Sequence, residues 1–154
     1  MVIIIDPENH SIVYAMSFGG GVLKSTDQGC SWYSIHTTEG IMYYDMAVST
    51  VNSKKLWLAG ANDSSGVFFF SYDQGENWIK TNNTPTSSMN EALVVEDLHF
   101  VVVGSWNDGC YLMRNDYTWS KMTAIDFDAI TDLWIDHNNV LHVFPGGMAF
   151  IKWT

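Results

Sequence analysis

Several acidic and aromatic residues occupy turn-like stretches in which their side chains could bind a sugar or a cation. Asp126 and Asp128 lie two positions apart just before a β-rich run, and on an extended segment such side chains point the same way. Trp106 precedes a turn that contains Asp108, so an exposed indole beside a carboxylate would offer a stacking platform for a sugar ring. For the aspartates we favour the simpler interpretation, in which they are solvated turn residues.

Motifs for other kinds of chemistry are missing from the sequence. The five histidines show no metal-ligand spacing, and there is no phosphate-binding, dinucleotide-binding or serine-nucleophile motif. Cys30 and Cys110 form neither a disulfide framework nor a metal signature, so we interpret both as free thiols. We therefore expect no metal ion and no cofactor, and the sequence identifies no catalytic residue.

The composition indicates a folded domain with an acidic surface. The chain has 154 residues, of which 47% are hydrophobic and 14% aromatic, which is enough material for a single core. The formal net charge of −10 repels phosphate groups, so neither nucleic acid nor an anionic membrane is an expected partner. A carbohydrate, a cation or a protein partner remains compatible with this charge.

The sequence also carries an expectation about cellular location. Its apolar stretches fall short of the roughly 18 residues of a membrane span, and its first residues lack the basic region of a signal peptide. We therefore expect a cytoplasmic protein, or an extracellular one if a leader has been removed.

An internal repeat organises the chain. The segment Ser25–Trp32 returns as Ser71–Trp78 with five of eight positions identical, and the two tryptophans are 46 positions apart. A third copy, Arg114–Trp119, has lost its glycine and is two residues shorter. We call these segments the first, second and third repeat turns. Their shared residues are Ser25, Asp27, Gly29 and Trp32, then Ser71, Asp73, Gly75 and Trp78, then Asp116 and Trp119.

A repeat of more than 40 residues with several short strands per unit is typical of β-propeller blades. The chain divides into units at about 1–37, 38–82, 83–123 and 124–154, with four, four, four and three β-rich runs. No window shows a helical period, so we expect almost no helix. The runs Ile3–Ile5, Val67–Phe70 and Val101–Val103 are apolar on both faces, which predicts strands covered from two sides. We therefore predict an all-β protein, a β-propeller domain of about four blades with the fourth incomplete.

The pattern Ser-x-Asp-x-Gly-x-x-Trp resembles the Asp-box, or BNR repeat, of propellers in sialidases, sortilin-type receptors, xyloglucan-cleaving hydrolases and photosystem assembly factors. In that family the box is a structural turn between the third and fourth strands of a blade. The resemblance implies that Asp27 and Asp73 cap turn amides and that Trp32 and Trp78 pack into the blade core. These residues are accordingly structural rather than catalytic.

The resemblance also implies which face carries a site. In such propellers the repeat turns lie on one face, and the usual site lies on the other, among the loops that join second to third strands and successive blades. Here that loop face would collect Phe18, Glu39, Tyr43, Asp45, Asp63, Trp106, Asp108, Asp126, Asp128 and Pro145. Our candidate ligand-binding residues are Trp106, Asp108, Asp126, Asp128, Asp45 and Asp63. Trp57 and Trp134 are expected in the core.

The number of blades leaves three alternatives, because Asp-box propellers usually have six or more. Two copies could associate as a homodimer, each supplying a half-ring. A four-bladed ring could close imperfectly, or the chain could be a piece of a longer protein. We rank the homodimer first.

Three functions follow from this reasoning. A sialidase-like site needs three arginines, and the chain has only Arg114. We therefore favour a non-catalytic propeller module that binds a carbohydrate or a protein partner through its loop face. The first alternative is a glycoside-hydrolase-like enzyme or a fragment of one, which needs two carboxyl groups about 5–9.5 Å apart. The second is a structural or assembly protein.

Overall fold

The computed structural model describes residues 1–63, 65–85, 89–95, 100–114, 116–123, 127, 129–136, 138, 140–145 and 151–153. Within these ranges the chain forms fifteen strands and no helix. The strands are β1 (Val2–Ile5), β2 (Val13–Ser17), β3 (Gly21–Ser25), β4 (Tyr33–His36), β5 (Met42–Val48), β6 (Leu56–Ala61), β7 (Gly66–Ser71), β8 (Ile79–Lys80), β9 (Met89–Val95), β10 (Phe100–Ser105), β11 (Cys110–Arg114), β12 (Trp119–Lys121), β13 (Ile130–Ile135), β14 (Leu141–Pro145) and β15 (Ile151–Trp153).

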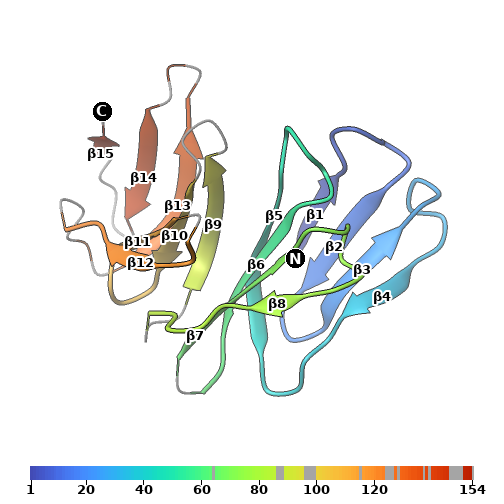
Figure 1. The fold of residues 1–154 in the computed structure, drawn as a ribbon, viewed down its shortest axis with the longest axis horizontal. Helices are drawn as coiled ribbons and strands as arrows, with labels where there is room; N and C mark the ends of the chain where they lie inside the picture. Colours follow the sequence, from blue (N-terminus) through green and yellow to red (C-terminus); the bar gives the residue numbers. More distant parts are fainter. Residues whose placement is uncertain are drawn as a thin grey trace.

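The strands form four antiparallel sheets, each made of strands that follow one another in the chain. The first sheet is β1-β2-β3-β4, the second β5-β6-β7-β8 and the third β9-β10-β11-β12, while the fourth contains β13-β14-β15. The sheets follow one another along an arc, with the first and the fourth at opposite ends (Figure 1). The prediction of an all-β protein with a shorter fourth sheet is confirmed.

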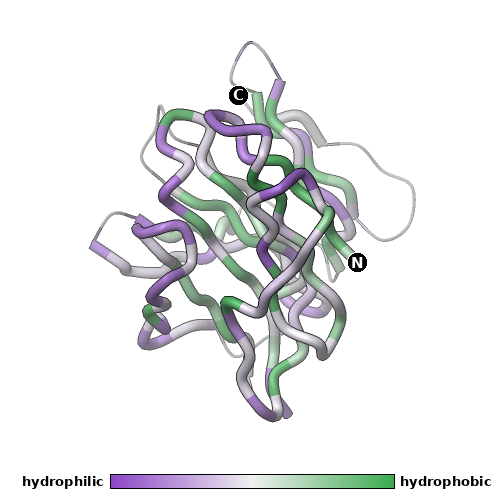
Figure 2. The backbone as a smooth tube through the Cα atoms, turned by 90° about the vertical axis from the view of Figure 1, so that its right-hand side faces the viewer, coloured by the Kyte–Doolittle hydropathy of each residue, from purple (hydrophilic) through white to green (hydrophobic). Residues whose placement is uncertain are grey.

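The core consists of three apolar layers, one between each pair of successive sheets. Strand β7 explains how they arise, because its side chains alternate: Val67 and Phe69 enter the first layer, and Phe68 and Phe70 enter the second. The third layer joins Val102 of β10 to the fourth sheet. Hydrophobic stretches therefore run along the strands, while hydrophilic ones gather at the turns (Figure 2). This confirms that the runs at 67–70 and 101–103 are covered from both sides.

The first repeat turn connects β3 to β4 through a closed set of hydrogen bonds. The Ser25 Oγ accepts from the backbone N–H of Gly29 at 2.8 Å and donates to Asp27 Oδ1 at 2.8 Å. The Asp27 carboxylate accepts from the Ser31 N–H at 2.8 Å and from the Ser31 Oγ at 2.6 Å. Asp27 therefore satisfies turn donors, as a structural residue does.

The second repeat turn repeats this arrangement, and the third keeps only the capping by its aspartate. Asp73 accepts from the N–H of Asn77 at 2.8 Å and from its Nδ2 at 2.7 Å. Asp116 accepts from the N–H of Thr118 at 3.0 Å and from its Oγ1 at 2.6 Å. The residue after each aspartate has a positive φ of 58–62°, and in the third turn this residue is Tyr117. The shortened copy thus keeps the left-handed turn even without its glycine.

The tryptophans of the repeat turns differ in their surroundings. Trp78 packs against the first apolar layer and Trp119 against the second. Trp32, however, is 39% exposed, and its indole N–H donates to the carbonyl of Gly29 at 2.9 Å. The expectation that Trp32 packs into the core is therefore wrong, because its ring lies against its own turn.

Each later repeat turn also reaches back to the preceding sheet. The buried Lys24 of β3 donates from Nζ to the carbonyl of Gln74 at 3.1 Å. At the next boundary the ring of Tyr117 stacks on Phe70 of β7, with centroids 4.9 Å apart and planes 9° from parallel. Lys24 and Phe70 directly precede the serine of their own repeat turns, so the same position joins successive sheets by different chemistry.

Candidate functional site

Three loops of the first and second sheets meet around a hollow at one end of the molecule. They are the β2–β3 turn, the β4–β5 loop and the β6–β7 turn, all of which belong to the predicted loop face. The hollow has a volume of about 400 Å³, which lies within the usual range of small-molecule sites. We call it the loop-face hollow. It is lined by Gly19, Thr38, Glu39, Gly40, Ile41, Met42, Tyr44, Ala61, Asn62 and Asp63.

A glycine conformation and an asparagine side chain fix the conformations of the loops around the hollow. A Cβ at Gly21, where φ is +84°, would lie 2.3 Å from the carbonyl oxygen of His36, so only glycine lets β3 begin against β4. Asn62 closes the β6–β7 turn, since its Oδ1 accepts from the Ser65 N–H at 2.8 Å and its N–H donates to the Ser65 carbonyl at 3.0 Å. This turn carries Asp63, whose side chain is exposed.

The apolar part of the hollow includes Tyr44 and Met42, and Phe18 lies beside Tyr44. Phe18, 60% exposed at the β2–β3 turn, lies with its ring centroid 5.3 Å from that of Tyr44. The pairing of β5 with β6 shifts register between Tyr43 and Asp45, which is a β-bulge. Tyr43 is buried on one side of this bulge, whereas Tyr44 lines the hollow. Met42, 47% exposed, adds a flexible apolar wall.

The polar part of the hollow is acidic. Glu39 and Asp63 are both exposed, and Thr38 and Asn62 add a hydroxyl and an amide. None of the lining residues is a lysine, an arginine or a histidine. Such a surface can accept hydrogen bonds from hydroxyl groups while a ring stacks on an aromatic face. It repels anions.

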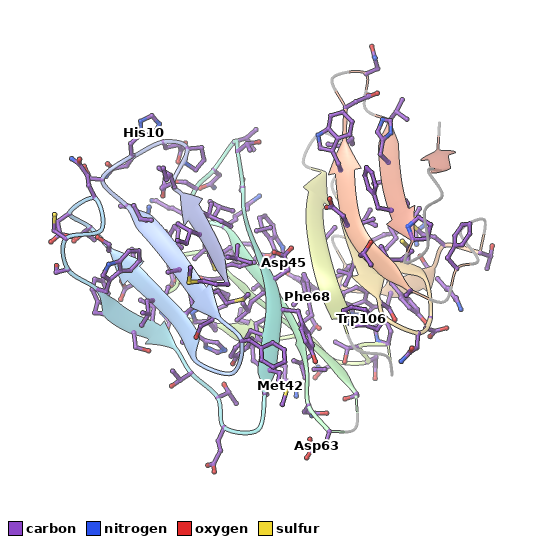
Figure 3. All side chains as sticks on the ribbon, turned by 180° about the vertical axis from the view of Figure 1, so that it is seen from behind. His10, Met42, Asp45, Asp63, Phe68 and Trp106 are labelled. Atoms are coloured by element: carbon purple, nitrogen blue, oxygen red, sulfur yellow. The ribbon has the colours of Figure 1, made fainter. Side chains whose placement is uncertain are left out.

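The structure places the predicted site residues in different parts of the molecule. Asp63 lines the loop-face hollow, whereas Asp45 is half-buried within β5. Trp106 lies in the β10–β11 turn of the third sheet. Asp63 lies near one end of the molecule, and Asp45 lies closer to its middle. Trp106 lies on the other half of the arc (Figure 3). Asp126 and Asp128 lie outside the described residues.

Asp108 has partners of its own within the third sheet. Its carboxylate accepts from the Lys121 Nζ at 2.5 Å and from the Tyr111 hydroxyl. Burial, followed by the hydrogen bond to Asp108 and its charge, raises the pKa of Tyr111 to about 12. Asp108 thus ties the β10–β11 turn to the outer strand β12, which is a structural task. Lys121 is 13 residues away in the sequence, so no local spacing could reveal the pair.

The tryptophans outside the repeat turns divide as follows. Trp106 is 47% exposed and Trp57 only 9%, as expected. Trp134 is 52% exposed, so the expectation that it lies in the core is wrong. Along β13, Leu133 enters the third apolar layer and Trp134 points the opposite way, where its ring lies 4.7 Å from that of His142.

Three residues in or beside the hollow were not among the predicted ligand-binding residues. Glu39 and Phe18 were expected on the loop face but not proposed as ligand-binding, and Tyr44 was passed over in favour of Tyr43. Tyr44 reaches the hollow because of the bulge. The sequence Met-Tyr-Tyr-Asp does not show which of the two tyrosines departs from the strand alternation.

Two general features of the described part of the chain bear on function. No group of three or more His, Cys, Asp or Glu side chains there is arranged to hold a metal ion. Helices with the length and apolar character of a membrane span are likewise not found in it.

Comparison with known proteins identifies the fold. Neither a protein-family model nor a curated protein sequence matches the chain. Among solved structures, an ancestral GH74 enzyme matches 92% of the chain with a TM-score of 0.74 at 16% identity, over 21% of its own length. YCF48 from Cyanidioschyzon merolae matches 99% with a TM-score of 0.71 at 16% identity, over 52% of its length. An auxiliary nutrient binding protein from Bacteroides thetaiotaomicron matches 93% with a TM-score of 0.68 at 11% identity, over 35% of its length.

These likenesses concern the fold alone, because the identities are low. The chain has the architecture of β-propeller proteins and spans between about a fifth and a half of the length of these three structures.

Proposed function

We propose that the chain is a non-catalytic module of an Asp-box propeller and that its loop-face hollow binds a neutral carbohydrate. The observation that carries the proposal is the composition of the hollow. Tyr44 and Met42 supply apolar surface, and Glu39, Asp63 and Asn62 supply hydrogen-bonding groups around it. Sugars have both an apolar ring face and a rim of hydroxyls, so they match this combination.

Charge and exposure support binding rather than other uses of the hollow. Its two carboxylates, with no lining cation, disfavour phosphorylated or acidic ligands. Both carboxylates are exposed, whereas a carboxyl group that acts as general acid is generally held in an enclosed, apolar setting. The hydrogen-bonded aspartates of the repeat turns support the kinship with Asp-box proteins. A nutrient-binding protein and GH74 enzymes among the structural neighbours are compatible with a carbohydrate ligand.

The test is affinity electrophoresis of the protein in gels that contain soluble xyloglucan, mixed-linkage β-glucan or another neutral polysaccharide. We expect retardation by at least one of them. Tyr44→Ala removes the stacking surface, and losing an aromatic contact worth about 1.5 kcal/mol weakens binding about 10-fold. Trp106→Ala is the comparison variant, because it removes the other predicted aromatic ligand residue, which is exposed outside the hollow.

Two results would count against the proposal. One is retardation lost with Trp106→Ala but kept with Tyr44→Ala, which would move the site to the third sheet. The other is no retardation in any neutral polysaccharide.

A glycoside-hydrolase activity is the second candidate, because Glu39 and Asp63 line the same hollow. Hydrolysis needs two carboxyl groups that face each other across a sugar. Reducing-sugar release from the polysaccharide that binds measures it directly. Activity abolished by Glu39→Gln and by Asp63→Asn, with binding retained, would replace the non-catalytic proposal by this one.

A further inference from the structure

The first sheet leaves an apolar face uncovered. On β1, Val2 and Ile4 pack against the first apolar layer, while Ile3 and Ile5 alternate to the opposite side and are each 58% exposed. The sequence predicted that Ile3–Ile5 would be covered from two sides, as β7 is. The structure covers it from one side only, so this part of the prediction is wrong for the isolated chain.

The uncovered face extends across three strands. The strand register places Ile3 beside Ala15 and Ala15 beside Leu23, which is 38% exposed. A second row pairs Ile5 with Val13. We call these five residues the outer face of the first sheet. All five are apolar in a chain of net charge −10, and sheets normally bury such a face against another layer.

The opposite end of the arc carries a second exposed face. In the fourth sheet Leu133, Leu141 and Val143 pack toward the third sheet. Trp134 and His142 pair across β13 and β14 on the other side. The outer face of the fourth sheet consists of Trp134, which is 52% exposed, the half-buried His142, and the neighbouring register pair of half-buried Phe144 and exposed Asp132.

We propose that a second copy of this chain covers both faces, with the first sheet of each copy packed on the fourth sheet of the other. Two arcs related by a two-fold axis would make this contact twice and so close a ring. The contact continues the sheet-on-sheet packing that joins the four sheets within one chain. Neither outer face then remains exposed.

Two observations favour a second copy over an unrelated partner. The chain carries both halves of the contact, an aliphatic face at one end and an aromatic one at the other. The two faces also lie at opposite ends of one arc of packed sheets, so a second arc can meet both of them at once (Figure 1). The proposal is independent of the carbohydrate-binding proposal, because the loop-face hollow lies between the first and second sheets of one copy.

The first measurement is the mass in solution by light scattering on a sizing column, over a 100-fold range of protein concentration. We expect twice the 17.4 kDa of one chain. Ile3→Lys would bury a charge in the contact and weaken dimerisation by roughly 100-fold or more. Because Ile3 is largely exposed in the single chain, the variant should keep its fold. Ile79→Lys is the matched control, since Ile79 is 51% exposed on β8 and lies on neither outer face.

A charge-complementation experiment tests which faces meet. Ile3→Lys and Trp134→Glu should each be monomeric alone. Mixed in equal amounts, they should form a heterodimer with one unchanged contact and one that pairs the new lysine with the new glutamate. Circular dichroism checks that each variant keeps the strand signal of the parent chain.

The outcomes separate clearly. A dimer lost with Ile3→Lys, kept with Ile79→Lys and recovered in the mixture supports the proposal. A wild-type monomer at every concentration overturns it, and so does a dimer that tolerates Ile3→Lys. Loss of the dimer without recovery in the mixture overturns the pairing of first with fourth sheets.

Discussion

Substituting Gly75 by alanine tests whether the second repeat turn packs against the first sheet. Gly75 has a φ of +87°, and a Cβ placed there would lie 2.5 Å from Ile35 Cδ1 and 3.4 Å from Leu56 Cδ1. Gly29 occupies the same position in the first repeat turn. Its φ is +89°, and a Cβ there would meet only Trp32 Cζ2, at 3.5 Å. The two glycines share their backbone conformation and differ in what surrounds them.

The difference in surroundings sets the expected magnitudes. Gly29→Ala carries only the cost of an alanine in a left-handed conformation, about 1–2 kcal/mol. Gly75→Ala carries the same cost and also displaces Ile35, which overpacking data place at about 1–3 kcal/mol. The lower end applies, because the atom met is the terminal methyl of a half-buried side chain. We expect Gly75→Ala to lose about 2–3 kcal/mol of unfolding free energy, about 1 kcal/mol more than Gly29→Ala.

Urea unfolding followed by tryptophan fluorescence measures both losses, and an unchanged m-value shows that the unfolded states are comparable. A double-mutant cycle identifies the source of the extra cost. Ile35→Val removes the Cδ1 methyl and alone costs about 0.5–1.5 kcal/mol. Combined with Gly75→Ala, it should recover about 1 kcal/mol of coupling. Equal losses for the two alanine variants, or no recovery with Ile35→Val, would refute the packing argument.

Three further predictions concern titration and ion pairing. Burial lowers the pKa of His36, so protonation in the unfolded state should reduce the unfolding free energy as pH falls below about 6.5. His36→Phe should flatten this dependence in urea unfolding between pH 7 and 5, and an unchanged slope would contradict the argument. Hydrogen bonds, first those from Ser31, lower the pKa of Asp27 to about 2, so its stabilisation is complete above about pH 4 and lost as pH falls toward 2. Asp27→Asn should therefore lower the urea midpoint at pH 7 and weaken its fall between pH 4 and 2, and an unchanged acid profile would contradict this. The Asp108–Lys121 pair should show a coupling of about 0.2–1 kcal/mol in a cycle of Asp108→Asn with Lys121→Met, smaller in 1 M salt.

The sequence predicted the fold better than the site, and the reason lies in the range of the signals. Turn residues and the repeat predicted the order of the strands, and the resemblance to the Asp-box implied the hydrogen bonding of Asp27 and Asp73. Apolar runs predicted strands that are covered on both faces. This prediction is correct for β7, which has a sheet on each side. At β1 the same signal failed, because coverage depends on a neighbour that the pattern does not specify.

Site residues depend on contacts that the sequence does not reveal. Asp63 was predicted and lines the hollow, but Tyr44 reaches it only through a bulge. Asp108 was predicted as a ligand residue, and the sequence did not show its hydrogen bond to Lys121, which is 13 residues away. Trp134 was assigned to the core by its hydrophobicity, whereas strand alternation decides which side it takes. In each case the residue type indicated a possible role, but tertiary contacts determined where the side chain points.

The backward reach of the repeat turns has a consequence for how the protein forms during synthesis. Lys24 is only 4% exposed, and its ammonium donates to the carbonyl of Gln74, which leaves the ribosome 50 residues later. Until the second sheet has emerged, Lys24 lacks this acceptor and the inner apolar face of the first sheet has no second sheet to pack against. Each sheet is therefore stabilised by the sheet that follows it in the chain, although the earlier sheet is synthesised first. Each sheet should gain protection from hydrogen exchange only once its successor has been translated.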